Sequence, residues 1–251
     1  MKKYKTINYH IYHFNQKEIA IFLLKWTGYM LVVSYLFFDS AYAVLFLIPT
    51  IFFFYKRENR QKIEARKQKL MIEFKEMILS LVTSLNGGYA LENAFEMSKK
   101  DMQLLYPNGT LIDKELETIL RGVQLNKPIE ELLADFGNRS GMEDIRNFAE
   151  VVTVAKRSGG NMISIIEKTV RNISDKIETE REITTMIAAK RLEQRIMSVM
   201  PFFILIYMRI MNGAYISVLY HNQMGILVMG ICLGLMWIAS GWARGIIDIS
   251  V

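Results

Sequence analysis

Cysteine, proline and histidine are scarce in this sequence, and each scarcity excludes a class of structure or chemistry. The single cysteine, Cys232, rules out a disulfide within one chain and a metal site built on several thiolates. Only four prolines are present, which suits long helices because proline breaks a helix interior. The three histidines do not fall in a His-x-x-x-His or Glu-x-x-His spacing, so we expect no bound metal ion.

The sequence also lacks the motifs of common nucleotide-binding enzymes. No Gly-x-x-x-x-Gly-Lys-Ser/Thr loop occurs, and no glycine-rich loop follows an expected strand. Two glycine pairs follow expected helices and predict helix-ending turns: Gly87, Gly88, Gly159 and Gly160. We interpret acid-rich stretches such as residues 113–117 as solvated faces or helix starts. We therefore expect no catalytic residues and no cofactor.

Apolar residues are abundant, at 51% of the chain, and they gather near its two ends. Residues 19–55 and 196–243 are mostly apolar, whereas residues 56–195 carry most of the charge. The run Ile19–Phe38 has about 20 residues, enough to cross a hydrocarbon core of about 30 Å. This layout predicts a polytopic membrane protein in which two transmembrane hairpins flank a charged central region.

Four transmembrane helices are expected, two in each apolar region. In residues 19–55, a turn near Asp39 separates the first span from a short second span at Tyr42–Tyr55. The third span begins near Ile196, and the fourth covers about Met224–Trp242. A cleaved signal peptide is disfavoured, because the first run is too long for one and another apolar run follows at once.

The positions of Lys and Arg predict the orientation of these spans. Basic residues flank both hairpins on the sides of residues 1–18, 56–195 and 244–251, whereas the connections at 39–40 and 212–223 contain none. The positive-inside rule then places both termini and the central region in the cytoplasm. The expected location is the cytoplasmic, or inner, membrane.

The central region has the periodicity of an all-α bundle. Apolar residues from Phe74 to Leu85 recur three and four positions apart, and the turn at residues 86–88 ends that helix, with Gly87 suited to the left-handed position. Further helices are expected at about 91–106 and 110–124, from 128, from 140 to 158, and from 161 to 208. Capping boxes are expected at Thr110 with Asp113 and at Ser140 with Glu143. Together these helices predict one cytoplasmic six-helix bundle.

Two charged helical extensions are expected to join this bundle to the membrane. The last helix continues for roughly 35 residues before its apolar end, which corresponds to a rod of about 50 Å. A similar extension covers residues 56–70. We refer to both extensions as stalks.

Basic residues near the membrane are the main candidates for interaction. The run Lys56–Lys69 is interpreted first as attraction to anionic lipid headgroups, and alternatively as a docking surface for an acidic cytoplasmic partner. The candidate contacts are Arg57, Lys62, Arg66, Lys67, Lys156, Arg157, Lys190, Arg191 and Arg195. Nucleic-acid binding is not expected, because the membrane accounts for the positive charge and no recognition motif is present.

Two cations, Lys25 and Arg209, lie inside the expected spans. Each is close enough to one membrane edge for its long side chain to reach water. The alternative is a polar contact with a membrane partner.

Several stretches resemble the type II secretion system protein F domain: SLVTSLNGGYALENAFE, LNKPIEELLADFGNRSG and FAEVVTVAKRSGGNMISIIEKTVRNISDKIETEREI. The tail, KRLEQRIMSVMPFFILIYMRIMNGAY with a final GWARGIIDISV, is similar more narrowly to TadB-like platform proteins of tight-adherence (Tad, Flp-type) pilus assembly. The resemblance covers about Met71–Val251, and the two spans before it carry no matching signature.

This resemblance implies a membrane platform for a type IV-like pilus or a type II secretion apparatus. It implies that a separate hexameric secretion ATPase docks beneath the platform and that pilin subunits pass from the bilayer into the fibre. Classical F proteins carry two copies of the bundle, whereas this chain carries one, as Tad platforms do. The resemblance therefore implies pairing with a second copy or with a sister platform protein.

Two other functions compete with the platform. A membrane signal transducer would use the charged helices as a relay, but the outward connections are too short to form a sensor domain. A transporter or membrane enzyme would need ionisable groups deep in the spans, and the only charged candidates, Lys25 and Arg209, lie near an edge.

Overall fold

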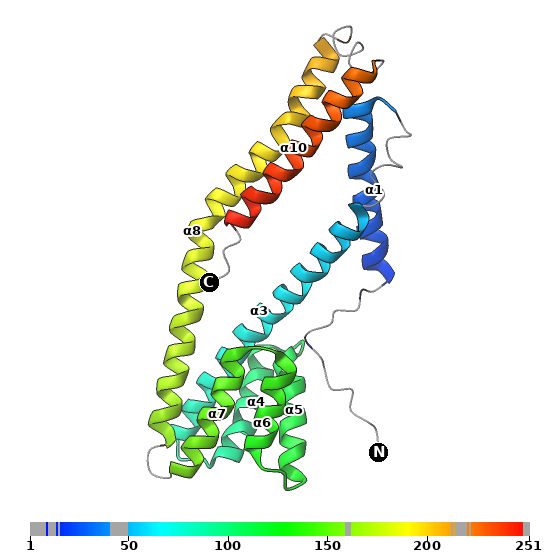
Figure 1. The fold of residues 1–251 in the computed structure, drawn as a ribbon. Coiled ribbons are helices and arrows are strands. Elements are labelled where there is room, and N and C mark those ends of the chain that lie inside the picture. The colour runs from blue at the N-terminus through cyan, green and yellow to red at the C-terminus, as the bar shows by residue number, and fades with distance from the viewer. Residues whose placement is uncertain are drawn as a thin grey trace. The chain divides into compact units, whose positions relative to one another are not determined.

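The computed structural model describes residues 9, 14, 16–40, 50–158, 162–211, 213, 220 and 222–247. Every regular element in these residues is a helix, which confirms the all-helical class (Figure 1). The helices are α1 (Gln16–Phe38), α3 (Thr50–Asn86), α4 (Leu91–Leu105), α5 (Leu111–Gln124), α6 (Ile129–Ser140), α7 (Glu143–Ser158), α8 (Met162–Met211) and α10 (Gln223–Ile247).

The chain divides into two compact units. The first, here called the bundle unit, comprises Met1–His13 and Glu58–Thr179. The second, the span unit, comprises Phe14–Arg57 and Glu180–Val251. Two helices, α3 and α8, contribute residues to both units.

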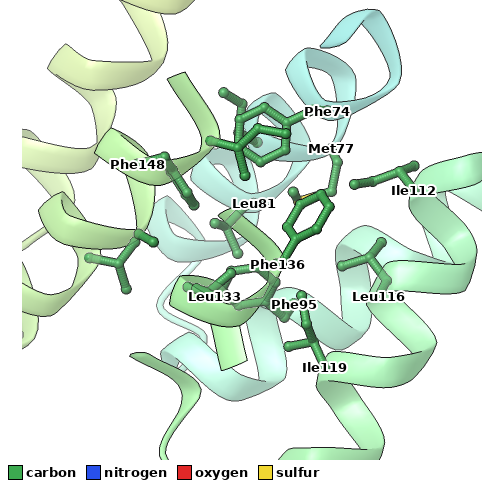
Figure 2. Packing of buried hydrophobic residues seen from close by; sticks show 14 of the residues in the cluster. Phe74, Met77, Leu81, Phe95, Ile112, Leu116, Ile119, Leu133, Phe136 and Phe148 are labelled. Carbon is green, nitrogen blue, oxygen red and sulfur yellow. The ribbon is translucent and has the colours of Figure 1, made fainter. Parts of the chain in front are cut away.

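An apolar core drawn from α3 through α8 holds the bundle unit together. Figure 2 shows side chains from several of these helices pointing toward a common centre. The ring of Phe74 on α3 lies edge-on to Phe148 of α7, with centroids 5.4 Å apart, and 6.2 Å from Phe136 of α6. All three rings are fully buried. The expected apolar stripe of residues 74–85 is therefore confirmed as the core-facing side of α3.

Local signals predicted some helix ends correctly and others incorrectly. The capping box at the start of α5 is confirmed: the Asp113 N–H donates to Thr110 Oγ1 at 3.1 Å, and the Thr110 N–H donates to Asp113 Oδ2 at 2.8 Å. The box expected at Ser140 is wrong, because Ser140 is the last residue of α6. Its hydroxyl donates to the Gly137 carbonyl and accepts from the Met142 N–H, so it turns the chain instead of capping α7.

The turn after α3 also differs by one residue from the prediction. The Gly87 N–H still bonds to the Thr83 carbonyl at 3.0 Å, as in a continuing helix. The left-handed conformation consequently falls on Gly88, with φ of +85°, and not on Gly87. The second predicted glycine turn, Gly159 and Gly160, and the expected cap at Asn161 lie outside the described residues.

The long last helix of the bundle is confirmed as one continuous element. It has 50 residues and runs through Pro201 without interruption. Its first turns are anchored in the bundle core by Ile166, Val170 and Ile173, which are buried. The stalks, as rods between bundle and membrane, stay a prediction.

Among the described residues, three helices are long and apolar enough to cross a membrane: Gln16–Phe38, Met162–Met211 through its apolar end, and Gln223–Ala243. Most of the second expected span, residues 42–49, lies outside the described part of the chain, and Thr50–Tyr55 begins α3. Three candidate membrane spans are therefore present among the described residues, whereas the counts of four spans and of six bundle helices stay predictions.

The close contact between α6 and α7 gives a test of this packing. A Cβ added at Gly137 would lie 3.0 Å from the Arg146 Cα, which is backbone and cannot swing aside. We expect Gly137→Ala to lower the free energy of unfolding by about 1 to 3 kcal/mol. Thermal unfolding of the detergent-solubilised full chain, followed by circular dichroism, measures the change. Gly28→Ala in α1, where a Cβ meets nothing within 4 Å, is the matched control and should not lower the midpoint.

Candidate functional site

The most enclosed ion pair of the bundle unit joins α5 to α6. The Glu115 carboxylate is only 2% exposed. Two nitrogens of the Arg139 guanidinium donate to its two oxygens at 3.0 and 2.7 Å, and the Arg139 Nε donates to Asp135 at 2.6 Å. This two-pronged geometry compensates the cost of removing the carboxylate from water.

Tyr9, which precedes α1, completes the same cluster. Its side chain is fully buried, its hydroxyl donates to Glu115 Oε1 at 3.0 Å, and its N–H donates to the Arg139 carbonyl at 3.4 Å. The Arg66 guanidinium lies 5.1 Å from the centre of the ring. Burial, and then the negative charge of Glu115, raise the pKa of the Tyr9 phenol far above its ordinary value, so the hydroxyl stays a donor.

A second enclosed carboxylate, Glu73 of α3, holds the first turn of α5. Its Oε2 accepts hydrogen bonds from the backbone N–H groups of Leu111 at 2.8 Å and Ile112 at 3.2 Å. The first N–H groups of a helix have no partner within it, and a negative charge there also favours the helix dipole. The N-terminus of α5 is thus fixed both by its own capping box and by a side chain from another helix.

The interpretation of residues 113–117 as a solvated face or a helix start is wrong for one of its three carboxylates. Asp113 is bound in the capping box at the start of α5, as predicted, whereas Glu115 is buried against Arg139. Glu117 keeps a partly exposed side chain, next to Arg121. A signal was present: Glu115 lies three residues after Ile112 and four before Ile119, within the apolar stripe of α5. The contribution of Tyr9 has no local signal at all.

The basic residues of the bundle unit that are candidates for contact with lipid or a partner fall into two groups. Some bind other residues of the unit, and others face solvent. Lys156 of α7 lies 3.3 Å from carboxylate oxygens of both Glu92 and Glu130. Burial tends to lower the pKa of Lys156, but its hydrogen bonds to Glu130 and Glu92 outweigh that and raise it. Lys67 reaches the Gly141 carbonyl at 3.5 Å. Arg157, the next residue after Lys156, is exposed.

The remaining candidates are spread over both units. Arg66 lies over Tyr9, and Lys62 is half-buried on α3. Arg57, Lys190, Arg191 and Arg195 belong to the span unit. Lys190 forms an ion pair with Glu193 at 2.9 Å, and Arg195 is exposed.

In the span unit, Arg209 of α8 is bound to the end of α1. It donates to the Tyr35 carbonyl at 2.8 Å and to Asp39 Oδ1 at 2.5 Å, and its guanidinium lies 3.8 Å from the centre of the Tyr35 ring. The Tyr220 hydroxyl adds a hydrogen bond to the Leu36 carbonyl at 2.6 Å. Sequence reasoning missed these partners within the chain. Lys25, the other cation within an expected span, is exposed on α1.

The described residues contain no group of three or more His, Cys, Asp or Glu side chains that could hold a metal ion. The enclosed carboxylates of the bundle unit, Glu73 and Glu115, both accept hydrogen bonds from groups that fix one helix to another. These two carboxylates and the apolar core therefore hold the helices of the bundle unit together.

Comparison with known proteins identifies the bundle. Residues 77–209 match the family model described as type II secretion system (T2SS), protein F, which is more than half of the chain. The chain belongs to the type II secretion system protein F family. The family domain begins in α3, contains the Glu115–Arg139 pair, and ends at Arg209 in the apolar part of α8. No curated protein and no solved structure matches the chain significantly.

Membership of the protein F family makes this chain a platform protein related to type II secretion and type IV pilus systems. Family membership and the three candidate membrane spans together indicate a protein of the inner membrane. Tyr9, α1 and α10 lie outside the matched residues, so the match does not cover the hydrogen bond of Tyr9 to Glu115.

The buried pair at Glu115 gives a second test. We expect Glu115→Gln to lower the free energy of unfolding by about 1 to 3 kcal/mol, because Arg139 loses its enclosed carboxylate partner and keeps only the more exposed Asp135. Thermal unfolding of the full chain in detergent measures the loss. Glu117→Gln on the same helix removes an exposed partner of Arg121 and should cost less than about 0.5 kcal/mol. Equal shifts for the two variants would contradict the structural role of the buried pair.

Proposed function

We propose that this protein is the inner-membrane platform of a tight-adherence type IV-like pilus, or of a closely related type II secretion apparatus. In this role it couples a cytoplasmic secretion ATPase to the extraction of pilin subunits from the bilayer. One observation carries the proposal: the family match begins in α3, covers the helices of the bundle unit and then continues along α8, one unbroken helix, into its apolar end. The tight-adherence subtype is supported by the resemblance of the C-terminal tail and by the single copy of the bundle.

The stiffness of α8 supports a mechanical role. Ile166 and Val170 fix its start in the bundle core, and charged residues cover the exposed segment that follows. An α-helix transmits displacement along its axis, whereas a flexible linker absorbs it. A force applied to the bundle therefore reaches the apolar end of the same helix.

The proposal assigns ATP hydrolysis to the partner and no catalytic or cofactor role to this chain. The partners are the secretion ATPase, pilin subunits, membrane lipids and either a second copy or a sister platform protein, with no nucleic acid. Residues 1–18, 56–195 and 244–251 face the cytoplasm in this scheme, and the transmembrane hairpins are residues 19–55 and 196–243. Arg157, exposed beside the bound Lys156, is the better candidate of the two for contact with an acidic partner.

Recovery of partners from native membranes tests the proposed role. We expect affinity purification of the full chain after mild cross-linking, followed by mass spectrometry, to recover a secretion ATPase together with a pilin. Recovery of a kinase or response regulator in their place would favour the signal transducer and reject the platform.

A break in α8 tests mechanical coupling. Thr184 is exposed, and its hydroxyl bonds only to the Glu180 carbonyl of its own helix. Thr184→Pro removes a backbone hydrogen bond and should cost the helix about 3 kcal/mol locally. We expect fibre output or secretion to fall strongly while membrane insertion persists, whereas the matched Thr184→Ala variant should behave as wild type. Normal output from the proline variant would reject coupling through a stiff helix.

A further inference from the structure

Two aromatic side chains that precede α1, Tyr9 and Phe14, contact the same helix, α3. Tyr9 is fully buried in the bundle unit, where the Arg66 guanidinium lies 5.1 Å from the centre of its ring. Phe14 belongs to the span unit, and its ring centroid lies 5.2 Å from that of Tyr55. Each contact therefore lies within one unit, and both lie on one unbroken helix.

The part of α3 between these two contacts lies outside the hydrophobic core of the bundle. The border between the units falls in this part, directly after Arg57. None of the side chains of residues 55–69 is buried, and Leu70 is the first residue after them to enter the core. Exposed ion pairs such as Arg60–Glu64 add little stability. A short exposed helical stretch of this kind is marginal by itself and depends on its surroundings to stay helical.

The chain that joins the two anchors is short. Tyr9 and Phe14 are five residues apart, and five residues span at most about 18 Å. Tyr55 and Arg66 are eleven residues apart on α3, which corresponds to a rise of about 16 Å along a helix axis. If this part of α3 unfolded, its eleven residues could extend to about 36 Å, and the short connection would forbid most of those conformations. A connection of this kind lowers the entropy of the locally unfolded state, as a cross-link does.

The anchor on the bundle unit is a specific one. The Tyr9 hydroxyl donates to Glu115 at 3.0 Å, and its N–H donates to the Arg139 carbonyl at 3.4 Å. Glu115 is itself held by the Arg139 guanidinium, so the acceptor for the hydroxyl is fixed in place. Tyr9 is thus bound to α5 and α6 as well as to α3.

We propose that residues 9–14 form a strap that braces α3 at the border between the two units, with Tyr9 as its anchor on the bundle unit and Phe14 as its anchor on the span unit. The strap opposes local unfolding of residues 56–65, which belong to the expected stalk. Its value for force transmission rests on the proposed function, whereas the brace itself does not depend on that function.

Hydrogen exchange of the purified full chain in detergent, measured by mass spectrometry, tests the strap. An insertion of about twelve Gly and Ser residues between Tyr9 and Phe14 keeps both anchors and lengthens only the connection. Because the cost of closing a loop grows with its length, we expect the amides of residues 56–65 to exchange about fivefold faster, while those of α5 stay unchanged. The same insertion directly after Met1 is the matched control and should alter neither. Unchanged exchange at residues 56–65 after the first insertion would overturn the proposal.

Loss of either anchor gives an independent test. Tyr9→Ala and Phe14→Ala should each raise exchange at residues 56–65 at least as much as the insertion does, and the double variant should do no more than either one, because a strap fails when one end is released. Additive effects would show two separate contacts and would overturn the strap. Tyr89→Ala removes an exposed tyrosine of the bundle unit and should have no effect.

Two further readouts separate the strap from other effects. Tyr9→Ala also removes a ring from the bundle core, so the α5 amides show whether the bundle stays folded, and the insertion variant, which keeps both rings, decides the case. Fibre output of the insertion variant is measured separately. Faster exchange with normal output would reject a role in force transmission and keep the brace, whereas unchanged exchange would reject the brace and leave the platform function untouched.

Discussion

The bundle depends on burial of aromatic rings supplied by helices that are distant in sequence. Phe74, Phe136 and Phe148 come from α3, α6 and α7 and lie in contact at a single centre. Each fully buried phenylalanine contributes roughly 1.5 to 3 kcal/mol relative to an exposed one. With 12 residues, α6 is short enough to be marginal as an isolated helix, so its helical structure depends on the shared core. The polar contacts described above then select one arrangement of the helices around it.

Those polar contacts join one helix to another, either at a helix end or between two helix faces. Glu73 joins α3 to the start of α5, and Glu115 joins α5 to α6 through Arg139. A carboxylate this enclosed is costly unless its acceptor oxygens are satisfied. Both oxygens of Glu115 accept hydrogen bonds, whereas Glu73 has Oε2 bound and Oε1 3.9 Å from Lys69 Nζ, so the Glu115 pair is the stricter constraint on how its two helices pack. Tyr9, which precedes α1 in the sequence, is held to the same pair of residues. Its hydroxyl donates to Glu115, and its N–H donates to the Arg139 carbonyl.

Sequence reasoning succeeded where the decisive interaction was local and failed where it was not. The Thr110–Asp113 box and the core face of α3 depend on residues a few positions apart, and both were predicted correctly. The prediction for Ser140 failed because its hydroxyl binds within the turn after α6, where it donates to the Gly137 carbonyl and accepts from the Met142 N–H, and not at the start of α7. The pairs Glu115–Arg139 and Arg209–Asp39 join helices through folding itself, and no spacing in the sequence encodes them. An acid within an apolar stripe, as at Glu115, is the one clue that could have indicated burial.

The composition of α8 changes along its length in a way that fits three physical environments. Its start supplies apolar side chains to a protein core, its middle is exposed and charged, and its end is apolar and exposed within the span unit. Pro201 lies in the third part, and it removes the N–H that would otherwise bond to the Met197 carbonyl. In a water-exposed rod such a break would cost rigidity, whereas neighbouring helices and adjacent side chains support proline in a membrane helix. Met197 also lines the groove between α8 and α10, so the carbonyl that loses this hydrogen bond lies on the side of α8 where a second helix is close. The charged segment of α8 is free of proline, and the proline of this helix lies in its apolar segment, where α10 supports it laterally.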